Sequence, residues 1–205
     1  MINEGEKIER TSFDIIEEKL EMPYPEKAIV TRIVHATADF SFADLVVFKD
    51  NPIEIGIKSL LEGKNIITDV NMVKSGISPI AKKFGCKVLC YVSDDETRVL
   101  SEKEGITRAR AACRLNKSKF KDSIIVVGNS PTSLFELAEL MKEGFNPALV
   151  IAAPVGFVKA KESKEEILKF PVPCIAVTGV KGGTPVAVSI INALIKLAQK
   201  NGKKT

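Results

Sequence analysis

The chain has 205 residues, of which 45% are hydrophobic and 27% charged, and its formal net charge is +4. This length and balance are typical of one globular domain with a sizeable core, so we expect a single domain over residues 1–205. The mild charge, with two tyrosines and no tryptophan, argues against nucleic acid as a partner, and no apolar run is long enough to cross a membrane. Residues 1–7 lack the apolar segment of a signal peptide, which favours a cytoplasmic protein.

The first predicted elements are a helix and a strand. Phe13, Ile16 and Leu20 recur at helical spacing, so we predict a helix over residues 12–21 that ends before Pro23. Residues 28–34 form an apolar, β-branched run that ends in a polar turn, which is the pattern of a buried parallel strand. A short helix is expected at residues 39–43, and residues 45–48 are either a strand or a buried connector.

Four further helices begin with the same sequence pattern. A capping residue precedes a proline at Asn51-Pro52, Ser78-Pro79, Ser130-Pro131 and Thr184-Pro185. Proline is favoured at the first position of a helix, where its missing N–H costs no hydrogen bond. The first three of these helices should end at Gly63, Gly85 and Gly144, and the fourth near residue 200. Residues 95–116 should hold one or two more.

Apolar strand candidates lie between these helices, at residues 65–68, 87–92, 123–127, 148–152 and 173–178. Strands that alternate with helices of this length predict a mostly parallel, doubly wound sheet with helices on both faces, an α/β fold. The four cysteines fit no zinc-binding pattern. We therefore expect buried free thiols and no metal site in the protein.

His35 is the only histidine in the chain, and it follows the predicted strand 28–34. Ligands of open α/β sheets bind outside the carboxyl ends of the strands, and histidine is the side chain that ordinarily exchanges protons near neutral pH. His35 is therefore the candidate acid or base. The alternative is a histidine that is merely hydrogen-bonded at the edge of the core.

Polar or glycine-rich turns follow the predicted strands at residues 65–68, 123–127, 148–152 and 173–178, and in a parallel sheet they should converge with His35 on one cleft. These turns contribute the candidate binding residues Asp69, Met72, Asn129, Gly156 and Lys181. Four of these residues have a structural alternative: Asp69 as a cap, Asn129 as part of a tight cap at residues 128–130, Gly156 as a turn residue and Lys181 as a solvated charge. The turn at residues 179–184 could bind an anion, but it matches neither the P-loop nor the dinucleotide fingerprint.

Seven segments together resemble the precorrin-8X methylmutases in order and approximate spacing, namely residues 10–16, 32–39, 69–77, 128–134, 154–158, 162–164 and 181–183. The resemblance extends from residue 9 to about residue 195. It implies a flavodoxin-like three-layer α/β/α sandwich and a homodimer.

The resemblance also implies an isomerase of cobalamin biosynthesis that moves a methyl group from ring carbon 11 to ring carbon 12 of precorrin-8. The product would be hydrobyrinate, or cobyrinate if the substrate carries cobalt. No cofactor and no external methyl donor are implied. The conserved histidine that protonates the macrocycle corresponds to His35, and the implied binding positions are Ser12, Ser78 and Arg108, the last reaching across the dimer. Ser78 stands where many relatives have threonine, and it keeps the hydroxyl group.

The implied substrate is a corrinoid with many carboxylates, so Arg10 joins the expected binding residues, because basic side chains recognise carboxylates. Two other functions stay open. One is a non-catalytic protein that binds or sequesters a tetrapyrrole. The other is a nucleotide-binding Rossmann-like enzyme, which the missing glycine patterns disfavour. Whether the natural substrate carries cobalt is also left open.

Overall fold

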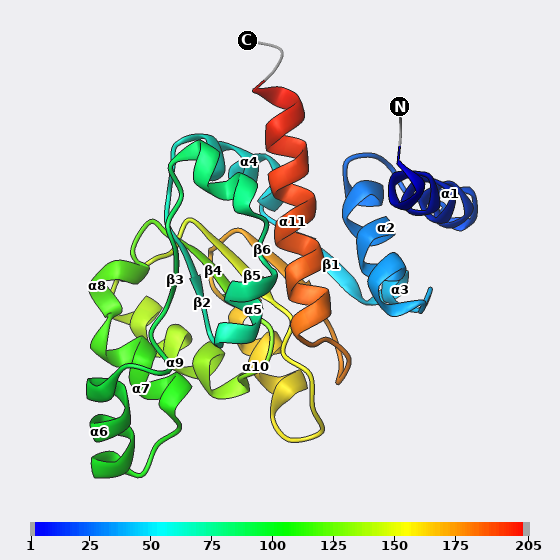
Figure 1. Cartoon of the computed structure of the whole chain (residues 1–205). Helices are drawn as coiled ribbons and strands as arrows, with labels where there is room; N and C mark the ends of the chain where they lie inside the picture. The colour runs from blue at the N-terminus through cyan, green and yellow to red at the C-terminus, as the bar shows by residue number, and fades with distance from the viewer. Residues whose placement is uncertain (1–2, 203–205) are drawn as a thin grey trace.

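The computed structural model describes residues 3–202 and is built around a six-stranded sheet with the order β1-β6-β5-β4-β2-β3 (Figure 1). Strands β2 to β6 are parallel, and their order is that of flavodoxin-like doubly wound sheets. Strand β1 pairs with β6 in the antiparallel direction. The predicted fold class is confirmed. The strands are β1 Val46–Lys49, β2 Ile66–Thr68, β3 Val88–Cys90, β4 Ile124–Val127, β5 Leu149–Ala152 and β6 Cys174–Val177.

Helices cover both faces of the sheet, because alternate side chains of each buried strand point to opposite layers. In β4, Ile124 and Val126 join the core beneath α2, α4, α5 and α11, whereas Ile125 and Val127 join the core beneath α8, α9 and α10. The helices are α1 Glu4–Lys19, α2 Glu26–Thr37, α3 Phe42–Leu45, α4 Pro52–Leu61, α5 Asn71–Gly76, η1 Pro79–Phe84, α6 Asp95–Glu104, α7 Arg108–Leu115, α8 Lys117–Phe120, α9 Pro131–Lys142, α10 Ala160–Ile167 and α11 Thr184–Asn201.

The capping pairs mark real helix starts. Helices α4, η1 and α9 each have their proline at the first position, and α11 has it at the second, although η1 is a 3₁₀-helix. Residues 95–116 form two helices, α6 and α7. Helix α1 begins earlier than predicted because Asn3 and Glu6 form a reciprocal capping box, with Glu6 N donating to Asn3 Oδ1 over 2.8 Å.

The predicted strand at residues 28–34 is wrong, because this segment lies within helix α2. Its apolar residues recur with helical spacing, and both sides of the helix are buried. Ile29 and Ile33 join the core with α11, while Val30 and Val34 pack with Ile16 of α1. A helix covered on two sides reads as a continuous apolar run, which mimics a buried strand. The strand of this region is β1, the first of the two alternatives for residues 45–48.

No helix within residues 3–202 combines the length and the apolar character that crossing a bilayer requires.

Candidate active site

His35 lies in the last turn of α2, exposed to solvent, and not at the carboxyl end of a strand as predicted. Its Nδ1 atom is 2.8 Å from the hydroxyl oxygen of Ser12 on α1. The Phe13 ring packs against the imidazole edge-on, with ring centroids 4.9 Å apart. The packing of α1 on α2 thus joins Ser12 and His35 and restricts the orientation of the imidazole.

A groove of about 560 Å³ runs along α1 and α2 beside His35. This volume is in the range that small-molecule sites occupy. Most of its wall is apolar, including the exposed side chains of Ile8 and Ile15. The groove is lined by Lys7, Ile8, Thr11, Ser12, Ile15, Ile16, Val34, His35, Ala38 and Phe40. Such a surface suits a large apolar group, and the imidazole of His35 forms part of its wall.

Asp69 lies at the switch point of the sheet, between β2 and β4, where the strand order reverses. Its buried carboxylate accepts the backbone N–H groups of Gly128 at 3.1 Å, Asn129 at 2.8 Å and Ser130 at 2.7 Å. Burial raises the pKa of Asp69, and the three N–H donors oppose that rise. The carboxylate therefore holds the turn before α9. The Asn129 and Met72 side chains are exposed nearby, the latter 71% accessible.

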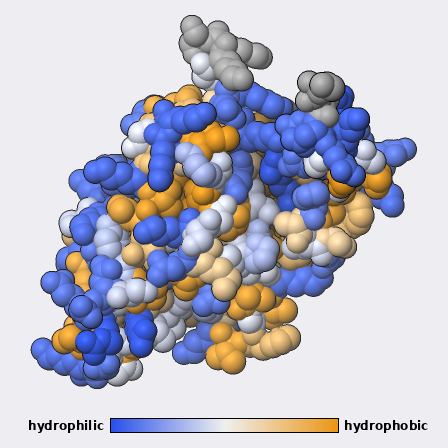
Figure 2. All heavy atoms as spheres, viewed as in Figure 1, coloured by the Kyte–Doolittle hydropathy of each residue, from blue (hydrophilic) through white to orange (hydrophobic). Residues whose placement is uncertain are grey.

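The glycine-rich turn after β6 packs against the loop after β5. Gly183 N donates to Ala153 O over 2.7 Å, and Gly156 N donates to Val180 O over 3.1 Å. A Cβ atom on Gly182 would lie only 2.4 Å from Ala153 O, so this close approach requires glycine. The loop around Gly156 ends in exposed apolar side chains, with Phe157 95% accessible. Figure 2 shows this hydrophobic surface at the lower edge of the molecule.

Lys181 connects this turn to the segment that follows α2. Its Nζ atom donates to Asp39 Oδ2 over 2.6 Å and to Ser41 Oγ over 2.7 Å. The hydrogen bond from Lys181 lowers the pKa of Asp39 to about 2. The ammonium group of Lys181 is therefore engaged by the chain itself, close to the end of α2 that bears His35.

Ser78 caps η1, its hydroxyl accepting from Ile80 N. Asn192 of α11 binds this turn through both the oxygen and the nitrogen of its side-chain amide. Its Oδ1 accepts from Ser78 N over 2.8 Å and its Nδ2 donates to Gly76 O over 2.9 Å. The role of Asn192 is not predictable from the sequence, because an asparagine inside a helix carries no local signal for a contact 114 residues away in the chain.

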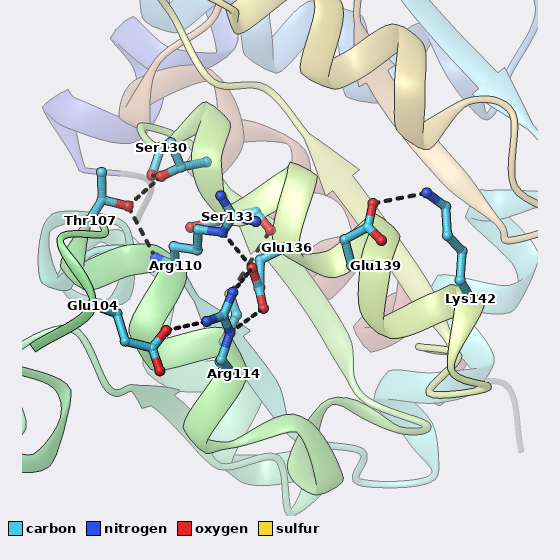
Figure 3. A network of polar contacts seen from close by, with 11 residues as sticks. Glu104, Thr107, Arg110, Arg114, Ser130, Ser133, Glu136, Glu139 and Lys142 are labelled. Carbon is cyan, nitrogen blue, oxygen red and sulfur yellow. Dashed lines mark hydrogen bonds and ion pairs between the residues drawn. The ribbon is translucent and has the colours of Figure 1, made fainter. Parts of the chain in front are cut away.

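Arg108 is the first residue of α7 and is exposed. The Thr107 hydroxyl caps this helix and lies 2.6 Å from the Thr132 hydroxyl of α9. Buried Glu136 accepts from Arg110 and Arg114, and the two guanidinium groups outweigh its burial and lower its pKa (Figure 3). These contacts fix α7 against α9.

Helix α7 belongs to the layer on the opposite face of the sheet from α2. In Figure 1, α7 lies at the lower left and α2 at the right. Within one chain, Ser12 and His35 therefore lie together between α1 and α2. Ser78, at the start of η1, and Arg108, at the start of α7, lie on other elements. Arg10 lies exposed on α1, outside the lining of the groove.

The family model described as precorrin-8X methylmutase matches residues 7–197. The chain is 51% identical to the cobalt-precorrin-8 methylmutase of Methanocaldococcus jannaschii, covering 87% of this chain and 82% of that protein. It is 40% identical to the cobalt-precorrin-8 methylmutase of Leptospira interrogans over 98% of each. The crystal structure of precorrin-8X methylmutase from Thermus thermophilus superposes with a TM-score of 0.88 at 35% identity, covering 95% of this chain and 98% of that one. The chain therefore belongs to the precorrin-8X methylmutase family.

Proposed function

We propose that this protein is a corrin-ring methylmutase of cobalamin biosynthesis that acts on precorrin-8 or its cobalt form. The bond between the methyl group and ring carbon 11 breaks, and a bond to ring carbon 12 forms. Product and substrate are isomers, so a proton that the enzyme donates to the macrocycle during the shift must be transferred back to the enzyme afterwards. The observation that carries the proposal is the hydrogen-bonded pair of Ser12 and His35 beside an apolar groove of about 560 Å³, in a member of this family.

His35 is the proton donor in this proposal. A neutral imidazole can accept the Ser12 hydroxyl proton at Nδ1, and an imidazolium can donate to the same oxygen. Because the hydroxyl can rotate between the two roles, Ser12 holds the ring in one place in both protonation states. General acid catalysis of this kind typically contributes about 10²- to 10⁴-fold in rate.

The remaining predicted residues would hold the anionic corrinoid. Arg10, Arg108 and Lys181 supply positive charge, the partly buried Ser78 supplies a hydroxyl group, and the exposed Asn129 and Met72 supply a polar and an apolar contact. Asp69 and Gly156 would act through the turns that they shape. Lys181 must exchange Asp39 for a substrate carboxylate in order to bind it. The proposal includes a single domain over residues 1–205 and a homodimer in the cytoplasm, with Arg108 of each chain completing the site of the other.

The test is turnover by the His35→Asn variant, with the metal-free and the cobalt-containing substrate incubated separately and followed by visible spectroscopy. Asparagine is smaller than histidine but can keep a hydrogen bond near the position of Nδ1, and it cannot transfer a proton near neutral pH. We expect the rate to fall by about 10²-fold or more while product binding is retained. Glu26→Gln, at the opposite end of α2, is the control and should turn over normally. Near-normal turnover by His35→Asn would leave His35 as a structural residue.

A further inference from the structure

We propose that Lys164 is a positioning residue, whose buried ammonium group ties the loops after β5 and β6 together and, through Lys181 and Asp39, fixes the end of α2 that bears His35. The inference rests on the proposed function in one respect: it takes His35 as the proton donor of the reaction.

Lys164 lies on α10 and is fully buried, with 0% of its surface accessible. Its Nζ atom donates to Pro154 O over 3.0 Å and to Lys181 O over 2.9 Å. Within residues 3–202, no carboxylate lies at ion-pair distance from this atom. A buried charge without a partner is costly, so these two carbonyl groups are what make the position tolerable. Burial lowers the pKa of Lys164 to about 8, which leaves the group mostly protonated at neutral pH.

The two carbonyl groups belong to the two loops at the carboxyl edge of the sheet. Pro154 begins the loop that contains Gly156, and Lys181 lies in the glycine-rich turn before α11. The loops already share two backbone hydrogen bonds, from Gly183 N to Ala153 O and from Gly156 N to Val180 O. Lys164, on α10, adds one side-chain hydrogen bond to each loop. The other charged residues of α10 include Lys161 and Glu165, which are exposed. The burial of Lys164 is therefore not a general feature of the charged residues of this helix.

The contacts continue from Lys181 to His35. Lys164 holds the main-chain carbonyl of Lys181, and the side chain of Lys181 holds Asp39 and Ser41. Asp39 follows the left-handed residue Ala38, whose N–H closes α2 on Val34 O at 2.7 Å. His35 lies in that final turn. A loss of the Lys164 contacts would therefore loosen the support under the proton donor, and displacements of about 1 Å can cost up to a hundredfold in rate.

The experiment uses His35 itself as the probe, because its imidazole is the only one in the chain. Lys164→Met keeps the aliphatic stem and removes the donors, and Lys161→Met on the exposed side of α10 is the matched control. We expect the imidazole signals in the proton NMR spectrum to shift in Lys164→Met and in Asp39→Asn but not in Lys161→Met. In the double variant Lys164→Met/Asp39→Asn, the imidazole signals should shift no further than in either single variant. Turnover by Lys164→Met should fall by about tenfold to a hundredfold.

A merely structural lysine would lower the melting temperature and leave the His35 signals unchanged, and that result overturns the proposal. If Lys164→Met does not fold, Lys164→Gln retains an N–H donor and is measured in its place. Asp39→Asn changes a surface residue and tests the last contact independently. Unmoved His35 signals in that variant overturn the proposal, whatever the Lys164 variants do. The NMR result does not depend on methylmutase turnover, so a failure of the proposed function would be seen separately.

Discussion

A single carboxylate at the centre of the sheet organises the turn between β4 and α9. Asp69 accepts three backbone N–H groups, two of them on the same oxygen. The side-chain amide of an Asp69→Asn variant would offer one acceptor oxygen and would turn an N–H₂ group toward backbone donors. We expect Asp69→Asn to lower the free energy of unfolding by about 2–4 kcal/mol, because buried donors lose their acceptor. Urea unfolding measures this loss.

The control for that substitution is Asp95→Asn, on the exposed side of α6, where the carboxylate side chain is 95% accessible. Its effect should stay within about 0.5 kcal/mol. Equal unfolding curves for the two variants would show that the Asp69 contacts add little to stability.

The ion pair between Lys181 and Asp39 makes part of the stability depend on pH. The hydrogen bond from Lys181 lowers the pKa of Asp39 from its ordinary value of 3.8 to about 2. A lowered carboxyl pKa stabilises the folded state above the ordinary value, and that contribution is lost as the pH falls through about 2. We expect Asp39→Asn to lower the melting temperature at pH 6 and to differ much less from the unsubstituted protein at pH 2, where the carboxyl group of Asp39 is about half protonated in the folded state. Asp44→Asn, exposed on α3, should differ little at either pH. A difference that is as large at pH 2 as at pH 6 would contradict the ion-pair explanation.

At the scale of elements, α5 and α11 approach each other so closely that Gly76 has no room for a side chain. A Cβ atom there would lie 2.7 Å from Cγ2 of Val188 and 2.9 Å from its Cγ1. We expect Gly76→Ala to destabilise the protein by about 1–3 kcal/mol through overpacking. Adding Val188→Ala should recover part of that loss, with a coupling energy of about 1 kcal/mol in a double-mutant cycle. Gly5→Ala on α1 meets nothing closer than 3.4 Å and should not destabilise.

The sequence predicted those elements whose signals are local. Capping residues followed by proline mark helix starts regardless of tertiary contacts, so α4, η1, α9 and α11 begin where expected. Helix α2 has the sequence pattern of a strand because α1 and α11 bury it on two sides. A short apolar run cannot reveal whether its burial is that of a strand or of a helix.

The candidate site was predictable only in part, for the same reason. His35 stood out because it is unique, but the groove beside it depends on how α1 packs on α2, a contact between distant segments. Lys164 lies in the segment 162–164, which resembles the precorrin-8X methylmutases, but that resemblance implies no role for it. Its burial, and its contacts with Pro154 and Lys181, follow from tertiary structure and leave no pattern in the local sequence.

At the scale of the whole molecule, the proposed proton donor His35 and the proposed binding residue Arg108 lie in different layers. His35 is on α2, which packs with α11, and Arg108 begins α7, which packs with α9 on the other face of the sheet. We predict that, if both act on one substrate, Arg108 is supplied by another copy of the chain. A two-fold dimer provides two equivalent sites of this kind, each with His35 from one protomer and Arg108 from its partner.

This arrangement predicts complementation between two inactive variants. We expect His35→Asn and Arg108→Ala homodimers each to have low turnover, because every site in them lacks one group. After mixing in equal amounts and subunit exchange, half of the dimers are mixed, and each mixed dimer has one intact site. Turnover should therefore rise to about a quarter of that of the unsubstituted protein. The dimer is checked by sedimentation against the chain mass of 22.3 kDa. If Arg108 serves the site of its own chain, each mixed dimer holds two incomplete sites, and mixing produces no gain.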